Sequence, residues 1–306
     1  MSIALISDPS CRLHKMGEHH PEQPARLDAI SNRLIACGLD MVLLHHEAPR
    51  ATREQLLAAH DESYIDLVFE SSPAEGLAWL DGDTAMNPHT LQAALHAAGA
   101  AVLGVDLVMQ GLADQAFCAV RPPGHHAERH KAMGFCFFNN VAVGAYHALN
   151  AYGLKRIAII DFDVHHGNGT EDIVSGDERV LFCSSFQHPY YPGPGFSMNV
   201  PNILNLPLPA LTDGTRFRAA VSESWLPKIE AFAPELIMIS AGFDGHREDE
   251  MAHFNLVEAD YVWITRQLAQ FATLSANGRI VSCLEGGYEL HSLARSVEEH
   301  IKAFMA

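Results

Sequence analysis

The sequence feature that most constrains the fold is a short apolar run that turns polar at its end. Residues 157–161 read Ile-Ala-Ile-Ile-Asp, and residues 162–170 continue as Phe-Asp-Val-His-His-Gly-Asn-Gly-Thr. A run of branched apolar residues bounded by polar and glycine residues is typical of a strand that is buried on both faces. We therefore expect a central strand whose end carries the chemistry of the protein.

Further apolar runs alternate with amphipathic segments along the whole chain. Alternation of this kind predicts an α/β fold with a mostly parallel sheet and helices on both faces. The 306 residues contain no flexible linker, repeat or low-complexity tract, so we expect one domain over residues 1–306. Strands are expected at residues 3–6, 41–45, 116–120, 157–161, 179–184, 235–240 and 279–284. Helices are expected at residues 24–37, 53–60, 63–69, 90–109, 139–151, 217–232, 256–273 and 293–304.

Composition excludes several classes of partner. The formal net charge of −17 argues against direct nucleic-acid binding, because phosphate backbones are held by Lys and Arg. No run of about 18 apolar residues occurs, so no membrane span is expected. The six cysteines form no CxxC pair, and residues 1–8 lack the pattern of a signal peptide. These features indicate reduced thiols and a cytoplasmic location.

Four polar motifs each follow an apolar run directly. They cover residues 121–126, 161–168, 241–244 and 285–288. In α/β sheets, ligands bind beyond the carboxyl ends of the strands. We therefore expect these four loops to meet in one crevice, although they are far apart in the chain.

The second motif has the residue spacing of a metal site. Asp161, Asp163 and His165 alternate, so in an extended chain their side chains point to the same side. Asp163, His165 and Asp244 offer two carboxylates and one imidazole, and three protein ligands are typical of a catalytic metal site. This oxygen-rich set suits Zn²⁺, Fe²⁺ or Co²⁺. The alternative is a polar turn that caps a strand, with Asp244 as a helix N-cap.

Two adjacent histidines, His125 and His126, follow a rigid Arg-Pro-Pro-Gly segment. At the mouth of a metal crevice they are candidate general acid–base groups; the alternatives are surface histidines or additional ligands. Asp161 and Asn168 are free to hydrogen-bond the far nitrogen of one histidine each. A carboxylate partner raises the basicity of an imidazole more than a neutral amide does, so we expect the two histidines to differ in role.

Aromatic residues surround the same motifs. Tyr288 follows two glycines, from where its phenol can reach the crevice and stabilise a developing oxyanion. The alternative is a half-buried tyrosine that ends a strand. Residues 134–140 read Gly-Phe-Cys-Phe-Phe-Asn-Asn, which suits either the core or a narrow apolar channel for an alkyl chain.

Taken together, these motifs resemble the histone deacetylase family, in its class II or bacterial acetylpolyamine-amidohydrolase-like branch. The resemblance runs in order from about residue 8 to residue 290 and includes His-Pro-Glu-Gln-Pro-Ala-Arg-Leu at residues 20–27. The motifs that carry it are residues 121–126, 134–140, 161–169, 242–244 and 285–288.

The resemblance implies an arginase/deacetylase-like three-layer fold and a mononuclear zinc hydrolase. It implies that His126 acts as general base and then acid, and that Tyr288 binds the carbonyl oxygen of the substrate. His125, paired with Asp161, would act mainly through its charge, with Asn168 as the partner of His126. The implied Zn²⁺ ligands are Asp163, His165 and Asp244.

The resemblance also implies a substrate channel. Asp83 would hold the backbone of the substrate, and Phe135, next to Gly134, would face Tyr191 across an acyl-lysine channel. Tyr191 departs from the family, which usually has Phe there. Met251 occupies the position at which polyamine-specific relatives carry an acidic gatekeeper, although Glu248, Asp249 and Glu250 are adjacent.

Monovalent-cation sites are implied as well. One K⁺ site would use Asp161, Asp163, His165, Ser184 and Ser185. A second would use backbone oxygens near Val174, Asp177 and Val180.

The expected function is a zinc-dependent deacylase that acts on acetyl-lysine or a similar acylated amine. The alternatives are an acetylpolyamine amidohydrolase and a non-catalytic acyl-lysine-binding relative. A binuclear manganese ureohydrolase would need further carboxylates around a second metal, and the motif at residues 241–246 supplies only Asp244. Residues 187–199 and the helical segments are compatible with a homo-oligomer interface.

Overall fold

The computed structural model describes residues 1–305 and places one parallel sheet at its centre. Among these residues the sheet has eight strands in the order β2-β1-β5-β10-β9-β6-β7-β8, all paired in parallel. The strands are β1 (Ile3–Ser7), β2 (Leu44–Glu47), β5 (Gln115–Cys118), β6 (Ile157–Asp161), β7 (Val180–Gln187), β8 (Ile203–Leu208), β9 (Leu236–Ala241) and β10 (Ile280–Leu284).

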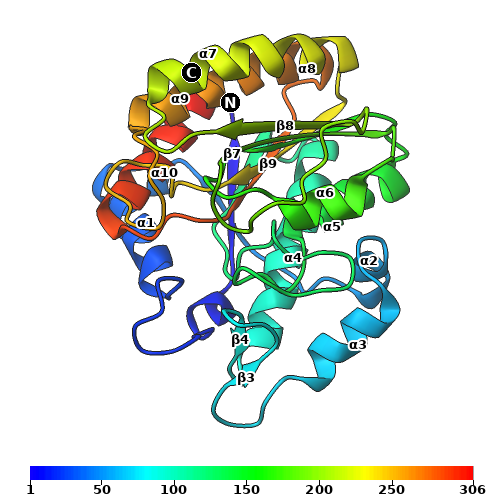
Figure 1. Cartoon of the computed structure of the whole chain (residues 1–306), viewed down its shortest axis with the longest axis vertical. Coiled ribbons are helices and arrows are strands. Elements are labelled where there is room, and N and C mark those ends of the chain that lie inside the picture. The colour runs from blue at the N-terminus through cyan, green and yellow to red at the C-terminus, as the bar shows by residue number, and fades with distance from the viewer. Residues whose placement is uncertain (306) are drawn as a thin grey trace.

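Helices cover both faces of the sheet, as Figure 1 shows. On one face α4 (Thr90–Met109) and α5 (Asn140–Tyr152) pack against each other and against the central strands. On the other face lie α1 (Ala25–Ala36), α7 (Gly214–Ser224), α8 (Leu226–Phe232), α9 (Glu258–Ser275) and α10 (Leu290–Phe304). Shorter elements are α2 (Arg53–Leu57), α3 (Glu62–Glu70), α6 (Asn168–Val174), the 3-10 helices η1 (Pro9–Arg12) and η2 (Leu39–Met41), and the hairpin of β3 (Ala78–Trp79) and β4 (Ala85–Met86). The predicted three-layer α/β fold is confirmed.

The strand order explains how the four polar motifs meet. The motifs follow β5, β10, β9 and β6, which are four consecutive neighbours in the sheet. All four strands are fully buried, in keeping with their apolar composition and with helices on both faces. Because the strands run in parallel, their carboxyl ends and the loops that follow lie side by side.

Helix α4 accounts for the most apolar part of the chain. By length and composition it is long and apolar enough to cross a membrane, but 72% of its most apolar window is buried inside the fold. Alanine and glycine at its contact positions allow α4 to approach α5 and strands β1, β5 and β10 closely. Its apolar character therefore reflects its place in the core.

Several elements differ from the sequence prediction; helix α6 and the β3–β4 hairpin, for example, were not expected. The helix expected over residues 217–232 is two helices that meet at the buried Trp225, because Pro227 lies where α7 would need a backbone N–H to continue. Strand β8 has no counterpart in the prediction; it contains Pro207, which a strand tolerates at the edge of a sheet. Strand β2 begins at Leu44, later than expected.

Candidate metal centre and active site

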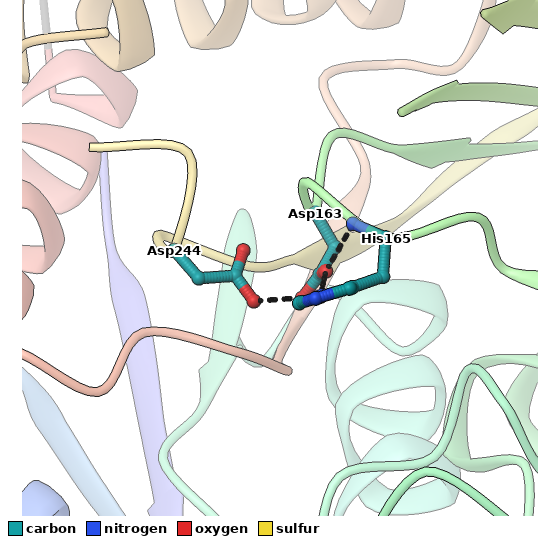
Figure 2. A group of neighbouring side chains, drawn as sticks. All are labelled: Asp163, His165 and Asp244. Carbon is teal, nitrogen blue, oxygen red and sulfur yellow. Dashed lines mark hydrogen bonds and ion pairs between the residues drawn. The ribbon is translucent and has the colours of Figure 1, made fainter. Parts of the chain in front are cut away.

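Asp163, His165 and Asp244 converge at the ends of two neighbouring strands. Asp163 and His165 follow β6, Asp244 follows β9, and one ligand atom from each of the three lies within 4.8 Å of the others. His165 Nδ1 is 3.1 Å from Asp163 Oδ1 and 3.2 Å from Asp244 Oδ2 (Figure 2). All three residues are buried. The expected convergence of two carboxylates and one imidazole is therefore present.

Glycines and backbone amides hold the two carboxylates in place. A Cβ on Gly242 would overlap Asp163 Oδ2, and a Cβ on Gly286 would overlap Asp244 Oδ2, so only glycine allows this close approach. Gly286 N donates to Asp163 Oδ2 at 2.8 Å, and Val164 N donates to Asp244 Oδ1 at 3.0 Å. The glycines next to the acidic residues in the sequence motifs are therefore part of the site.

The electrostatics of the triad fit a divalent cation. Burial and the charge of Asp163 raise the pKa of the Asp244 carboxyl to about 6. Two carboxylates this close in a dry site repel each other, and a divalent cation would compensate both charges. Two oxygens and one nitrogen are also a donor set that Zn²⁺ accepts.

The two histidines after β5 each have the partner expected from the sequence. His125 Nδ1 donates to Asp161 Oδ2 at 2.9 Å, and His126 Nδ1 donates to Asn168 Oδ1 at 2.7 Å. The centroids of the two rings are 4.0 Å apart, and His125 Nε2 lies 3.8 Å from Asp163 Oδ2. His125 Nε2 is therefore directed towards the triad, and the His126 ring lies beside the His125 ring.

The two histidines differ in charge. Burial favours a neutral His125, but the nearby carboxylates of Asp163 and Asp161 outweigh burial and raise the pKa of His125 to about 10. Burial and the positive charge of His125 hold the pKa of His126 well below its usual range. A neutral His126 with a hydrogen on Nδ1 leaves a lone pair on Nε2, which is the form that can accept a proton.

Glu285 begins the fourth polar motif, but the sequence assigned it no role. Its carboxylate is buried and accepts hydrogen bonds from Gly124 N at 2.6 Å and His125 N at 3.1 Å. Ser240 Oγ donates to the same carboxylate at 3.2 Å. Burial raises the pKa of Glu285 to about 7. Glu285 thus fixes the backbone of the histidine loop, and only the tertiary structure brings these residues together.

One cavity of about 220 Å³ opens onto this site. Its lining includes every residue that the sequence assigns to substrate binding, together with residues assigned to the metal and to catalysis. Tyr190 is the lining residue that the sequence did not point to. The cavity is lined by Asp83, His126, Gly134, Phe135, His165, Tyr190, Tyr191, Met251 and Tyr288.

Aromatic rings form much of the cavity wall. The ring of Tyr191 lies 5.2 Å from that of His126, and the ring of Phe135 lies 6.0 Å from that of Tyr288, both edge to face. The ring of Tyr190 stacks on His165 at 5.9 Å, and its hydroxyl donates to the backbone oxygen of Met251 at 3.0 Å. These rings give the cavity a largely apolar surface beside the polar triad.

The β3–β4 hairpin brings Asp83 to the cavity. Asp83 Oδ1 accepts a hydrogen bond from Gly134 N at 3.1 Å, and Thr84 Oγ1 accepts one from Phe135 N at 3.0 Å. Gly134 and Phe135 both have positive φ, of 56° and 70°. The hairpin therefore supports an unusual backbone turn that directs Phe135 into the cavity wall.

Tyr288 is a neutral donor in this setting. It is partly buried, and burial together with the Asp244 carboxylate holds the pKa of its phenol well above the usual value. The phenol therefore keeps its proton over the physiological pH range and is able to donate a hydrogen bond to a negative oxygen.

The residues of the first expected K⁺ site lie next to one another. Asp161 pairs with Ser184 in the sheet, Asp163 N donates to Asp161 Oδ1 at 3.1 Å, and Ser184 Oγ accepts from Gly167 N at 3.3 Å. Ser185 Oγ is buried and has no hydrogen-bond partner among residues 1–305. Cation binding there stays a prediction.

The backbone oxygens expected to form the second K⁺ site converge on the side chain of Asn202. Asn202 Nδ2 donates to the backbone oxygens of Val174 at 2.9 Å, Asp177 at 3.2 Å and Val180 at 2.9 Å. Asn202 Oδ1 accepts from Gly176 N at 3.0 Å, which fixes the orientation of the amide. The three oxygens therefore lie close together, and cation binding there stays a prediction.

Comparison with known proteins agrees with this geometry. Residues 20–304 match the family model described as histone deacetylase domain. The chain is 36% identical to histone deacetylase 14, chloroplastic, of Arabidopsis thaliana, over 98% of this chain and 76% of that protein. It is 35% identical to polyamine deacetylase HDAC10 of Homo sapiens, over 96% of this chain and 44% of that protein.

A solved structure resembles the fold over nearly its full length. The crystal structure of the HDA15 HD domain superimposes with a TM-score of 0.93 at 34% sequence identity, covering 99% of this chain and 89% of that one. The two proteins therefore share the whole fold, which includes the sheet and the loops that form the site. This chain belongs to the histone deacetylase family.

Proposed function

We propose that this protein is a Zn²⁺-dependent deacylase that hydrolyses the amide of acetyl-lysine, or of a similar acylated amine, to a carboxylate and a free amine. The observation that carries this proposal is that His165 of the triad, His126 and Tyr288 line the same cavity. A Lewis-acid site, a proton acceptor and a neutral hydrogen-bond donor are the groups that amide hydrolysis by water requires.

Each residue then has a chemical task. When bound by Asp163, His165 and Asp244, Zn²⁺ would supply Lewis acidity for the amide carbonyl and for water. His126 Nε2 accepts the proton of the attacking water and afterwards donates it to the leaving amine. Tyr288 donates a hydrogen bond to the carbonyl oxygen as negative charge develops there.

His125 and Asp161 act through charge. Their hydrogen bond places an imidazolium 3.8 Å from Asp163, which lowers the cost of gathering carboxylates in a buried site. The same positive charge keeps His126 neutral and ready to accept a proton. Asn168 keeps the hydrogen of His126 on Nδ1.

The shape of the cavity supports a linear acylated amine as substrate. Phe135 and Tyr191 supply apolar surface for an alkyl chain, and Asp83 offers a carboxylate to an amide N–H or a cationic group. Met251 supplies an apolar side chain where polyamine-specific relatives carry an acidic one, which favours acyl-lysine. Acetylpolyamines are the second candidate, because one relative is named a polyamine deacetylase and the net charge of −17 favours cationic substrates.

We propose one catalytic metal ion. Within residues 1–305, Asp163, His165 and Asp244 form the one group of three or more such side chains close enough to share an ion, which argues against a binuclear ureohydrolase. The K⁺ site at Ser184 and Ser185, a homo-oligomer and a cytoplasmic location stay predictions.

Side-by-side assays test the proposal. Turnover of an acetyl-lysine peptide and of an acetylated polyamine is measured with the same Zn²⁺-loaded protein, with Asp244→Asn as the inactive control. We expect a higher kcat/KM for the peptide, loss of activity after chelation, and recovery with one equivalent of Zn²⁺ or Co²⁺. A higher kcat/KM for the polyamine would select the second candidate. Tight ligand binding without turnover of any acylated amine would favour a non-catalytic binding protein.

A further inference from the structure

Asp249 is a buried carboxylate that joins two loops of the site. It is 5% exposed, and its Oδ2 accepts hydrogen bonds from the backbone N–H groups of Tyr288 at 2.6 Å and Glu289 at 3.0 Å. Its Oδ1 accepts a hydrogen bond from Met251 N at 3.0 Å. One side chain thus satisfies three backbone donors, two of them in a loop that lies far away in sequence.

Two of these three backbone groups belong to residues that line the cavity. Tyr288 carries the phenol assigned to the carbonyl oxygen, and Met251 forms part of the substrate wall. The Asp249 carboxylate therefore sets the distance between the loop after β9 and the loop after β10 at the point where both contribute to the site.

The backbone next to Tyr288 needs such an anchor. Tyr288 follows Gly286 and Gly287. Gly287 has φ of 115°, a backbone conformation that residues with a side chain rarely adopt. Glycine restricts the backbone least of all residues, so the glycine pair alone does not fix the direction of the following phenol. Helix α10 begins only at Leu290.

Other contacts hold different parts of the same loop. Arg26 Nε donates to the backbone oxygen of Gly287 at 2.6 Å, and the Arg26 guanidinium lies 4.9 Å from the centre of the Tyr288 ring. The ring of Phe135 touches the Tyr288 ring edge to face. These contacts hold the carbonyl side of Gly287 and the faces of the ring, whereas Asp249 holds the amide of Tyr288 itself.

We propose that Asp249 is a positioning residue for Tyr288: by anchoring the Tyr288 and Glu289 amides and the Met251 amide together, it places the phenol for catalysis. The inference rests on the function proposed above. A carboxylate is needed because both of its oxygens accept hydrogen bonds, whereas an asparagine amide presents a nitrogen donor to at least one backbone N–H.

The neighbouring acidic residue provides a matched control. Glu250 is exposed, directly follows Asp249 and carries the same charge. Asp249→Asn and Glu250→Gln therefore remove the same charge one residue apart, and only the first disturbs the anchor. Asp249→Ala removes all three hydrogen bonds; if it fails to fold, Asp249→Asn still tests the inference.

A double-mutant cycle separates positioning from general destabilisation. The kcat and KM of Asp249→Asn, Tyr288→Phe and the double variant are measured on an acetyl-lysine peptide with matched Zn²⁺ content. We expect Asp249→Asn to lower kcat by roughly 10- to 100-fold with little change in KM, and Glu250→Gln to behave as wild type. In the Tyr288→Phe background, Asp249→Asn should change kcat by less than about twofold, because its effect passes through the missing hydroxyl. An equal loss of kcat in both backgrounds, or no loss in either, overturns the inference.

Amide hydrogen exchange tests the anchor without relying on activity. In the full chain we expect Asp249→Asn, but not Glu250→Gln, to speed exchange in the peptide that covers residues 285–291. Unchanged exchange overturns the inference. If the wild-type protein turned over no acylated amine, the proposed function would fail, and the exchange measurement would still decide whether Asp249 anchors this loop.

Discussion

Asn168 holds the proton of His126 on one defined nitrogen. His126 Nδ1 donates to Asn168 Oδ1 at 2.7 Å, and Asn168 Nδ2 in turn donates to Glu128 Oε1 at 2.8 Å. Glu128 thereby determines which end of the amide faces the histidine. The result is a chain of three residues that leaves the Nε2 lone pair of His126, which lines the cavity, free to accept a proton.

Replacing Asn168 should therefore impair proton transfer. Asn168→Ala removes the acceptor for the Nδ1–H, so His126 samples both tautomers, and we expect kcat to fall by about tenfold or more. Steady-state kinetics at constant Zn²⁺ content measure the effect. Glu128→Gln is the milder control, because a glutamine oxygen still accepts from Asn168 Nδ2. A wild-type kcat for Asn168→Ala would contradict the assigned role.

Removing the hydroxyl of Tyr288 should lower turnover while the metal stays bound. The phenol is the one neutral donor assigned to the carbonyl oxygen, so we expect Tyr288→Phe to lower kcat by roughly 10²-fold or more. Zn²⁺ content measured by atomic absorption should equal that of wild type, since Tyr288 is not a proposed ligand. Near-normal turnover in this variant would remove Tyr288 from the mechanism.

The glycine beside the triad should be essential for metal binding. A Cβ on Gly286 would overlap Asp244 Oδ2 and lie 2.6 Å from Asp163 Oδ2, so Gly286→Ala forces both carboxylates to move. We expect Zn²⁺ affinity to fall by at least about tenfold in a competition titration with a chelator. Gly82→Ala is the control, because a Cβ there meets open space. Equal affinities for the two variants would show that the site tolerates the displacement.

His60 should make the fold less stable in acid. His60 Nδ1 hydrogen-bonds the backbone oxygen of Glu128, and Asn139 N donates to His60 Nε2 at 2.9 Å, so the folded protein requires the neutral ring. Burial lowers the pKa of His60 from 6.5 to about 4. Above pH 6.5 both states are neutral; as pH falls from 6.5 to 4 the unfolded chain gains the proton first, and stability is lost.

The size of this effect is measurable. A pKa change from 6.5 to about 4 corresponds to about 3 kcal/mol of unfolding free energy, most of it lost by pH 4. Urea unfolding at a series of pH values gives the free energy directly. His60→Gln does not titrate, so its curve should be flatter than that of wild type across this range. Parallel curves for the two proteins would argue against a neutral buried His60.

Local sequence patterns were enough to predict the layered fold and most residues of the candidate site. Alternating apolar segments predicted the layered α/β fold, and the alternation of Asp161, Asp163 and His165 placed three polar side chains on one side of a strand end. These features depend on backbone periodicity, which is already present in a short stretch of chain. For the same reason the partners of His125 and His126 were predictable once the motifs were known to share a crevice.

The tertiary structure decided what periodicity does not encode. It set the order β5-β10-β9-β6, which brings the four loops together. It also placed Glu285 against the backbone of His125, 160 residues away, and Asp249 against the backbone of Tyr288, 39 residues away. In the same way it placed the Asn202 amide against the backbone oxygens of Val174, Asp177 and Val180. Strand order and contacts over such separations depend on how side chains pack in three dimensions, and a hydrogen bond between distant segments leaves no repeating signal in the chain.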